Sequence, residues 1–392
     1  MSVRALLCSS VLFIAACADP VTSPRVVRPA LSVGQSSNVD EIVDGSVGPG
    51  ALYRLARPAN WNGGLLLYAH GYVSPTQPIA LPPEGDLLIS LLNPQGFAVA
   101  FSSFTENGWA VKDGTQRTHQ LLGIFTSQFG KPSRVYVGGA SMGGLVAIKL
   151  TETYPHTYDG TLSACAVGAG LLNLLTYHAN VRALFDVLYP GVLPGNAAFL
   201  PPGTDPNTGI IAPAAAAITA NPLPALSIPL ITQTPVPGSN PLEQIQAILT
   251  AIGGNAGSLA DVQALTNGKP YFENRNTTYT SPFLPAPLMA AINAGIGRFS
   301  AAPSAVQLLD HEYTPSGDLQ IPMLMLSNAV DPVVPGFNQA SYLAAVTAQG
   351  AGNLLVQRTV PAFGHCVFTP TELATAFSDL VLWVELGIKP LP

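Results

Sequence analysis

The stretch RVYVGGASMGGLVAIKL, residues 134–150, joins a strand pattern to a helix pattern with almost nothing between them. Its first half is rich in residues that favour strands, and residues 145–150 can wind as a helix. Four glycines surround Ser141 at the junction, and residues without a Cβ allow a strand and a helix to approach closely. The stretch therefore predicts a tight strand-to-helix turn with Ser141 at its apex.

Residues 139–143 match the pattern G-x-S-x-G, known as the nucleophile elbow. Such short patterns also arise by chance, for instance in a glycine-rich connection whose serine caps a helix. The strand before the motif and the helix after it are the context that the motif requires. Ser141 is therefore the first candidate for a catalytic residue.

The 392-residue chain carries little charge, with 10% charged and 48% hydrophobic residues and a formal net charge of -6. This composition favours one large core with an apolar surface or cleft. Nucleic-acid binding usually requires an excess of basic residues, which the chain lacks. We therefore expect no nucleic acid among its partners.

Residues 1–16 have the layout of an export signal: a positive charge, an apolar stretch and small residues before Cys17. The tetrapeptide ending at Cys17 also resembles a bacterial lipobox, in which that cysteine is lipidated. The alternative is an ordinary signal peptide. We expect lipidation at Cys17, a tether over residues 17–38, and an exported protein held at the cell envelope by its lipid anchor, or alternatively secreted. Later apolar segments are broken by glycine and proline, so we expect no transmembrane helix in the mature chain.

Strand and helix patterns alternate on both sides of an irregular central region. Strands are predicted at 51–58, 64–72, 97–104, 134–139, 161–169, 321–328 and 353–360, and helices at 113–130, 145–150, 336–350 and 369–387. Asp113, and either Thr369 or Thr371, are the expected N-caps of two of these helices. The alternation predicts an α/β fold with a mostly parallel central sheet and helices on both faces, formed by residues 39–170 and 304–392.

Residues 171–303 interrupt this alternation and are rich in alanine and proline. Helix-like patches occur at 171–189, 240–253 and 285–298. A structureless loop of this length inside a compact domain is improbable. A disordered linker is the alternative, but leucine, isoleucine and phenylalanine are too frequent for a segment that buries nothing. We expect an inserted helical cap.

A serine hydroxyl becomes a nucleophile when a base takes its proton and a third group orients that base. Asp331 follows the predicted strand 321–328, and His365 follows the predicted strand 353–360. The carboxyl ends of parallel strands share one edge of a sheet, which brings both side chains toward Ser141. The sequence therefore predicts a Ser-His-Asp triad.

Each partner also has a simpler explanation. Asp331 precedes a proline and could initiate a turn, and His365 could be a loop histidine packed against a neighbouring ring. Asp310, His311 and Asp318 are rivals. They precede the strand 321–328, however, and a triad acid there would lie at the wrong edge of the sheet.

The transition state of acyl transfer also needs donors for an oxyanion. One predicted donor is the backbone N–H of Met142, the residue after the nucleophile. The other is the N–H of Tyr72, in a loop shaped by His70 and Gly71. His70 could equally be a buried histidine at a strand end.

Cys165 and Cys366 are the cysteines that remain after export. They are expected at the same edge of the sheet, and an oxidising compartment permits a disulfide between them. Two buried free thiols are the alternative, since a sequence does not reveal Cα separations. No C-x-x-C or H-E-x-x-H spacing occurs, and we predict no metal site.

Four short motifs together resemble the α/β-hydrolase superfamily: HGY at 70–72, GASMG at 139–143, VDPVVP at 330–335 and GHC at 364–366. The resemblance covers about residues 40–170 and 304–390, with the insert where many lipases and esterases carry a lid. It implies hydrolysis of an ester or related acyl bond through an acyl-enzyme, without a cofactor.

The substrate is less defined, because the insert carries no recognisable subfamily signature. An apolar cap with few charges favours a small-molecule carboxylic ester with an apolar acyl or alcohol part. A serine peptidase of aminopeptidase type, using the same triad, is the alternative enzyme. A non-catalytic surface lipoprotein that binds ligands is the alternative from another class.

Overall fold

The computed structural model describes residues 39–238 and 240–392; the proposed signal peptide, Cys17 and the tether lie outside them. An eight-stranded sheet has the strand order β1-β2-β4-β3-β5-β6-β7-β8. The strands are β1 (Val39–Val47), β2 (Ala51–Pro58), β3 (Gly64–Ala69), β4 (Ala98–Ser102), β5 (Arg134–Ala140), β6 (Gly160–Ala164), β7 (Met323–Val330) and β8 (Leu355–Phe363). β2 pairs antiparallel with β1 and β4, and all other neighbours are parallel.

Helices cover both faces of the sheet because successive strand side chains point to opposite sides. The helices of the sheet domain are α1 (Pro83–Leu92), α2 (Val111–Phe129), α3 (Met142–Thr153), α9 (Pro303–Tyr313), α10 (Phe337–Ala348) and α11 (Pro370–Leu386). Leu65 and Leu67 join the core beneath α2 and α3, whereas Leu66 and Tyr68 join the core beneath α1 and α11. The predicted α/β fold class is confirmed.

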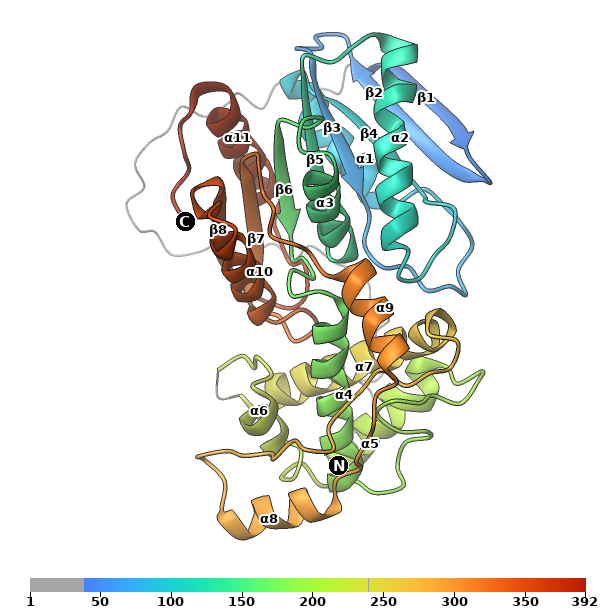
Figure 1. The fold of residues 1–392 in the computed structure, drawn as a ribbon, viewed down its shortest axis with the longest axis vertical. Coiled ribbons are helices and arrows are strands. Elements are labelled where there is room, and N and C mark those ends of the chain that lie inside the picture. Colours follow the sequence, from blue (N-terminus) through green and yellow to red (C-terminus); the bar gives the residue numbers. More distant parts are fainter. Residues whose placement is uncertain (1–38, 239) are drawn as a thin grey trace, which may run out of the picture.

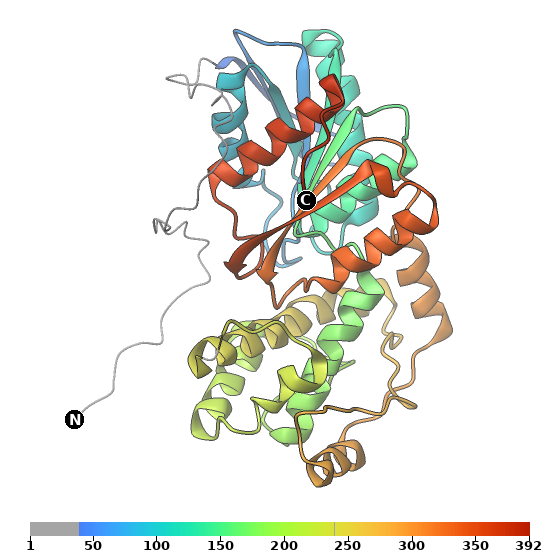
Figure 2. The ribbon, with the colours of Figure 1, turned by 90° about the vertical axis from the view of Figure 1, so that its left-hand side faces the viewer.

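The cap lies at one end of the sheet, and α4 extends into it from the region after β6 (Figures 1 and 2). Its helices are α4 (Leu171–Leu188), α5 (Ala212–Ala220), α6 (Ser227–Thr232), α7 (Pro241–Leu265) and α8 (Ala286–Gly295), and a short π-helical turn, η2, spans Pro206–Ile211. The predicted insertion is therefore helical. Among the described residues, no helix is long and apolar enough to span a membrane.

Several predicted boundaries need correction. The strands predicted at 64–72 and 161–169 end at Ala69 and Ala164, so the residues that follow are free to form loops. The predicted N-cap at Asp113 is wrong, because α2 begins at Val111. Asp113 lies within the first turn, accepts a hydrogen bond from the Thr105 N–H at 2.6 Å, and pairs with a buried arginine of the same helix. Its carboxylate thus still lies at the helix N-terminus, where negative charge is favoured.

Thr369 is the N-cap of α11 and forms a capping box with Glu372. β1 and α1 were not predicted from the sequence. β1 lies at the sheet edge and its described side chains are exposed or half-buried, which leaves little periodic signal. α9 was also missed, and it contains Asp310 and His311, two of the rival residues.

Candidate active site

Ser141 occupies a sharp turn between β5 and α3. Its backbone has φ 58° and ψ -122°, a conformation that L-residues rarely adopt. A Cβ at Gly139 would collide with the Gly143 carbonyl, and a Cβ at Gly143 would collide with the Ala69 carbonyl. The two glycines of the motif are therefore needed for the close approach of strand and helix.

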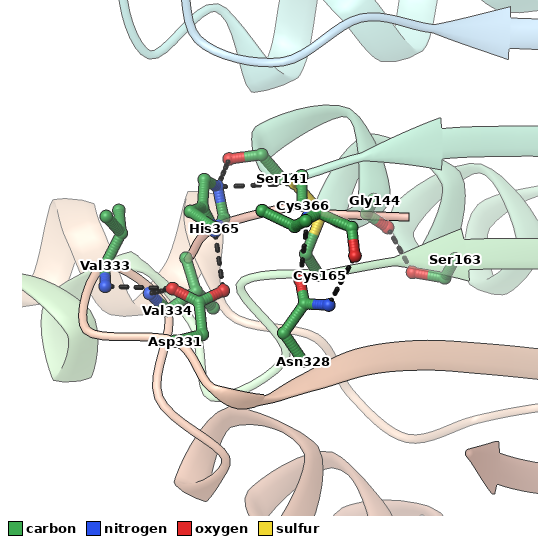
Figure 3. The surroundings of a disulfide bond; sticks show 11 residues. Ser141, Gly144, Ser163, Cys165, Asn328, Asp331, Val333, Val334, His365 and Cys366 are labelled. Atoms are coloured by element: carbon green, nitrogen blue, oxygen red, sulfur yellow. Dashed lines mark hydrogen bonds and ion pairs between the residues drawn. A yellow bond between two sulfur atoms is a disulfide. The ribbon is translucent and has the colours of Figure 1, made fainter. Parts of the chain in front are cut away.

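Ser141, His365 and Asp331 form one hydrogen-bonded array (Figure 3). His365 Nε2 lies 2.8 Å from Ser141 Oγ, and His365 Nδ1 lies 2.7 Å from Asp331 Oδ2. A carboxylate only accepts hydrogen bonds, so Nδ1 carries the proton and Nε2 is left as the acceptor for the serine hydroxyl. This arrangement can withdraw the serine proton and hold the resulting imidazolium.

Asp331 is buried, with 1% of its surface exposed, and its second oxygen is also satisfied. Oδ1 accepts hydrogen bonds from the N–H groups of Val333 and Val334, each at 2.9 Å. These bonds close a tight turn around the carboxylate and compensate its removal from water. The loop after β7 thus fixes the direction of Asp331.

The histidine loop is attached to the sheet at two further places (Figure 3). Cys366 forms a disulfide with Cys165 at the end of β6, with their Cα atoms 5.4 Å apart. The Asn328 side chain donates to the Val367 carbonyl at 2.7 Å and accepts from the Val367 N–H at 2.9 Å. Sequence reasoning missed Asn328, whose only signal is an amide beside Ser327 near the end of a mostly apolar strand.

The loop after β3 lies against the nucleophile turn. A Cβ built on Gly71 would be 3.4 Å from Ser141 Cβ, which places this loop beside the serine. His70 is buried, contacts the Gly71 carbonyl through Nδ1 at 2.7 Å, and stacks on Phe104. Burial lowers the pKa of His70, against the opposing effect of its hydrogen bonds to backbone carbonyls, which favours a neutral ring that shapes the loop.

One predicted oxyanion donor, Met142, follows the serine along the chain, and the other, Tyr72, follows Gly71 in the loop that lies against the serine. Met142 is the first residue of α3, so its N–H has no partner within the helix. Tyr72 is in the loop beside Ser141, and its ring lies against Trp109. Their role as oxyanion donors stays a prediction.

The rival residues are not in this array. Asp310 and His311 lie on α9 and are exposed, with neighbours on the same helix or just beyond it. Asp318 is half-way along the segment between α9 and β7. Cys165, Cys366 and His365 are close enough together to suggest a metal site, but the two sulfurs are already bonded to each other.

An apolar cavity of about 570 Å³ lies in the cap. Its lining includes Val187 and Leu188 at the end of α4, Leu223 just before α6, Leu230 on α6, and Leu288 on α8. The end of α4 is far from the sheet (Figure 1). The cavity is therefore separate from the Ser141 site.

Comparison with known proteins identifies the fold of the chain but no sequence family. No protein-family model and no curated sequence matches the chain. Feruloyl esterase B from Aspergillus oryzae has a TM-score of 0.52 at 15% identity, over 89% of this chain and 80% of its own. An esterase from Aspergillus oryzae has a TM-score of 0.47 at 17% identity, with 89% and 80% covered. Brefeldin A esterase, a bacterial homologue of human hormone-sensitive lipase, has 0.43 at 14%, with 92% and 78% covered.

The chain thus has the α/β-hydrolase fold, with ester hydrolases among its structural neighbours. At such low identity the likeness shows the fold alone. The chemistry depends on the residues at this chain's own site.

Proposed function

We propose that this protein is a serine hydrolase that cleaves carboxylic esters through an acyl-enzyme. The observation that carries the proposal is the continuous array from Ser141 Oγ through His365 to the buried carboxylate of Asp331. A protein that only binds ligands needs no aligned base and acid behind an accessible serine. The strained turn at Ser141 also has no evident structural benefit, and strain of this kind clusters at functional sites.

The proposed reaction has two halves. Ser141 Oγ attacks the ester carbonyl carbon while His365 Nε2 takes the hydroxyl proton, and the N–H groups of Met142 and Tyr72 bind the oxyanion. Collapse of the intermediate breaks the ester C–O bond, and His365 gives its proton to the departing alcohol. Water then attacks the acyl-enzyme by the same route, which releases the acid and restores Ser141.

Ester substrates are favoured over peptides because the cap offers little to hold a charged terminus. Arg182 is fully buried and pairs with Asp186 at 2.8 Å. Asp261 accepts a hydrogen bond from the Trp109 N–H at 2.6 Å. The other charges of the cap are few and scattered, which supports an apolar acyl or alcohol part: Asp205, Glu243, Lys269, Glu273, Arg275 and Arg298.

Activity profiling tests this preference. We expect p-nitrophenyl esters of graded acyl length to be hydrolysed with a kcat/KM at least about 100-fold above that of aminoacyl p-nitroanilides, because the one carboxylate in the described Ser141 array, Asp331, is already satisfied and is not free to pair with an amine. The measurement is the initial rate of p-nitrophenol or p-nitroaniline release by the same preparation. Faster cleavage of the anilides would establish the peptidase instead.

We also propose that the protein is exported and attached to the cell envelope through a lipid on Cys17. The proposal rests on the leader sequence and on the small residues before Cys17. The Cys165–Cys366 disulfide agrees with an oxidising compartment.

Mass spectrometry of the membrane fraction from a bacterial host tests the anchor. We expect a mature N-terminus at Cys17 carrying acyl groups, and loss of that modification with release from membranes in Cys17→Ser. Cys8→Ser is the matched control, because this cysteine lies within the leader that is removed. A soluble, lipid-free protein beginning at Ala18 or later would contradict the proposal.

A further inference from the structure

The loop after β7 that carries Asp331, called the acid loop, is bonded both to the Asp331 carboxylate and to the cap. Tyr177 and His178, consecutive residues of α4, reach two consecutive carbonyls of this loop. The Tyr177 hydroxyl donates to the Pro332 carbonyl at 3.0 Å, and His178 Nε2 lies 2.9 Å from the Val333 carbonyl. In the acid loop, backbone N–H groups therefore bond to the Asp331 carboxylate, and backbone carbonyls bond to side chains of α4.

Both cap side chains are in the form that these bonds require. His178 is fully enclosed, and burial lowers its pKa to about 4, against the opposing effect of its bond to Val333. The ring is thus neutral at ordinary pH, and Nε2 must carry the proton to donate to a carbonyl. Burial raises the pKa of Tyr177, which keeps its hydroxyl protonated.

A second cap helix, α7, is attached to the loops that carry Tyr72 and Trp109. The Tyr72 hydroxyl donates to the Gly257 carbonyl of α7 at 3.0 Å, and Asp261 of α7 accepts from the Trp109 N–H. The loop segments that carry Tyr72 and Trp109 are joined by a bridge between Val73 and Gly108. α7 thus holds the loop that carries Tyr72, the predicted oxyanion donor, much as α4 holds the acid loop.

The two cap helices meet at His178. A Cβ built on Gly254 of α7 would lie 2.7 Å from His178 Nε2 and 2.8 Å from its Cε1. The absence of a side chain at Gly254 is what leaves room for the imidazole. The contact between Gly254 and His178 therefore connects α7 to α4 and, through the bond to Val333, to the acid loop.

From this geometry we propose that α4 and α7 are a fixed part of the catalytic apparatus, with His178 the positioning residue that sets the acid loop and hence Asp331. The inference rests on the proposed function of the same site. Departure of α4 from the sheet would break the bonds to Pro332 and Val333, so α4 and α7 do not open as a lid. Any opening motion belongs to the cap segments beyond them, α5, α6 and α8.

Gly254→Ala tests the proposal with a single methyl group. The added Cβ must displace the buried His178 ring and break its bond to Val333. Because misplacement of catalytic groups by about 1 Å can cost about 100-fold, we expect kcat to fall about 10- to 100-fold with KM changed less than about threefold. Gly123→Ala is the matched control: it is also a helical glycine, on α2, and its Cβ would meet no heavy atom within 4 Å. We expect it to retain wild-type kcat.

Substitution of His178 separates positioning from packing. His178→Gln keeps an N–H donor near the position of Nε2, whereas His178→Leu has similar bulk and no donor. We expect His178→Gln to retain most of kcat, and His178→Leu to lose about as much as Gly254→Ala. Equal losses in both variants, with wild-type melting temperatures, would overturn the role of the hydrogen bond.

A readout that does not depend on turnover separates this inference from the proposed function. The proton between Asp331 and His365 is expected to give a downfield ¹H NMR resonance in the wild type and in Gly123→Ala, and a shifted or broadened one in Gly254→Ala. An inactive wild type would contradict the proposed function, whereas the NMR comparison could still be made. A wild-type resonance and wild-type kcat in a folded Gly254→Ala protein would overturn the inference.

Discussion

Ser141→Ala is expected to lower kcat/KM for p-nitrophenyl esters by about 10⁴- to 10⁶-fold, because it removes the only atom in the array that can form the acyl-enzyme. Among the described residues the hydroxyl makes one hydrogen bond, to His365, so the folded state should be almost unchanged. A fluorophosphonate probe should label the wild type and not the variant. Intact-mass spectrometry and the rate of ester hydrolysis measure the two effects.

Ser90→Ala is the matched control for this variant. Ser90 is exposed on α1, and its hydroxyl bonds to the Leu87 carbonyl of the same helix. This variant should be labelled and active like the wild type. Labelling that persists in Ser141→Ala would refute the assignment of the nucleophile, and a wild type that is never labelled would favour a ligand-binding protein.

His365→Ala should be nearly as damaging, since members of a triad act as a unit. The double variant Ser141→Ala/His365→Ala is therefore expected to be no worse than the more impaired single variant. Additive losses in this cycle would indicate that the two side chains act independently, which contradicts the 2.8 Å contact between them.

The features that the sequence predicted well are those encoded over a few adjacent residues. The apolar run before Ser141 and the glycines around it define both the strand and the turn, and β2 was predicted with its observed bounds. Asp331 and His365 follow strong strand patterns, so parallel pairing alone brings them to one edge of the sheet. Local pattern and global topology agree at these positions.

The features that were missed depend on partners far away in the chain. His178 lies in a mostly apolar helix pattern, and its partner Val333 is 155 positions away. In the sequence Asp261 is one of several scattered charges of the cap. Its bond to the Trp109 N–H depends on the packing of α7 beside Trp109. Nothing local distinguishes such residues from ordinary core or surface positions, because their role is created by packing of the cap on the sheet.

The pairing of Cys165 with Cys366 also depends on long-range placement, since β6 and the histidine loop had to bring the Cα atoms within bonding reach. The bond closes a loop with a sequence separation of 201. For a loop of this length the chain-entropy model gives about 5 kcal/mol of stabilisation, and removal of native disulfides typically costs about 2–5 kcal/mol. We expect Cys165→Ser/Cys366→Ser to lower the free energy of unfolding by an amount in that range, measured by guanidinium denaturation of the mature protein.

The effect on catalysis should be smaller than the effect on stability. In the folded double variant the histidine loop still has both hydrogen bonds between Asn328 and Val367 and the bond from the Gly364 N–H to the Val330 carbonyl. Well below the unfolding transition we therefore expect measurable esterase activity, with the loss appearing first as earlier thermal inactivation. Reductant should move the wild-type unfolding midpoint toward that of the double variant and leave the variant itself unchanged. Free thiol at both cysteines in the denatured, unreduced mature protein would show that no bond had formed, and an unchanged midpoint in the double variant would show that the bond adds nothing to stability.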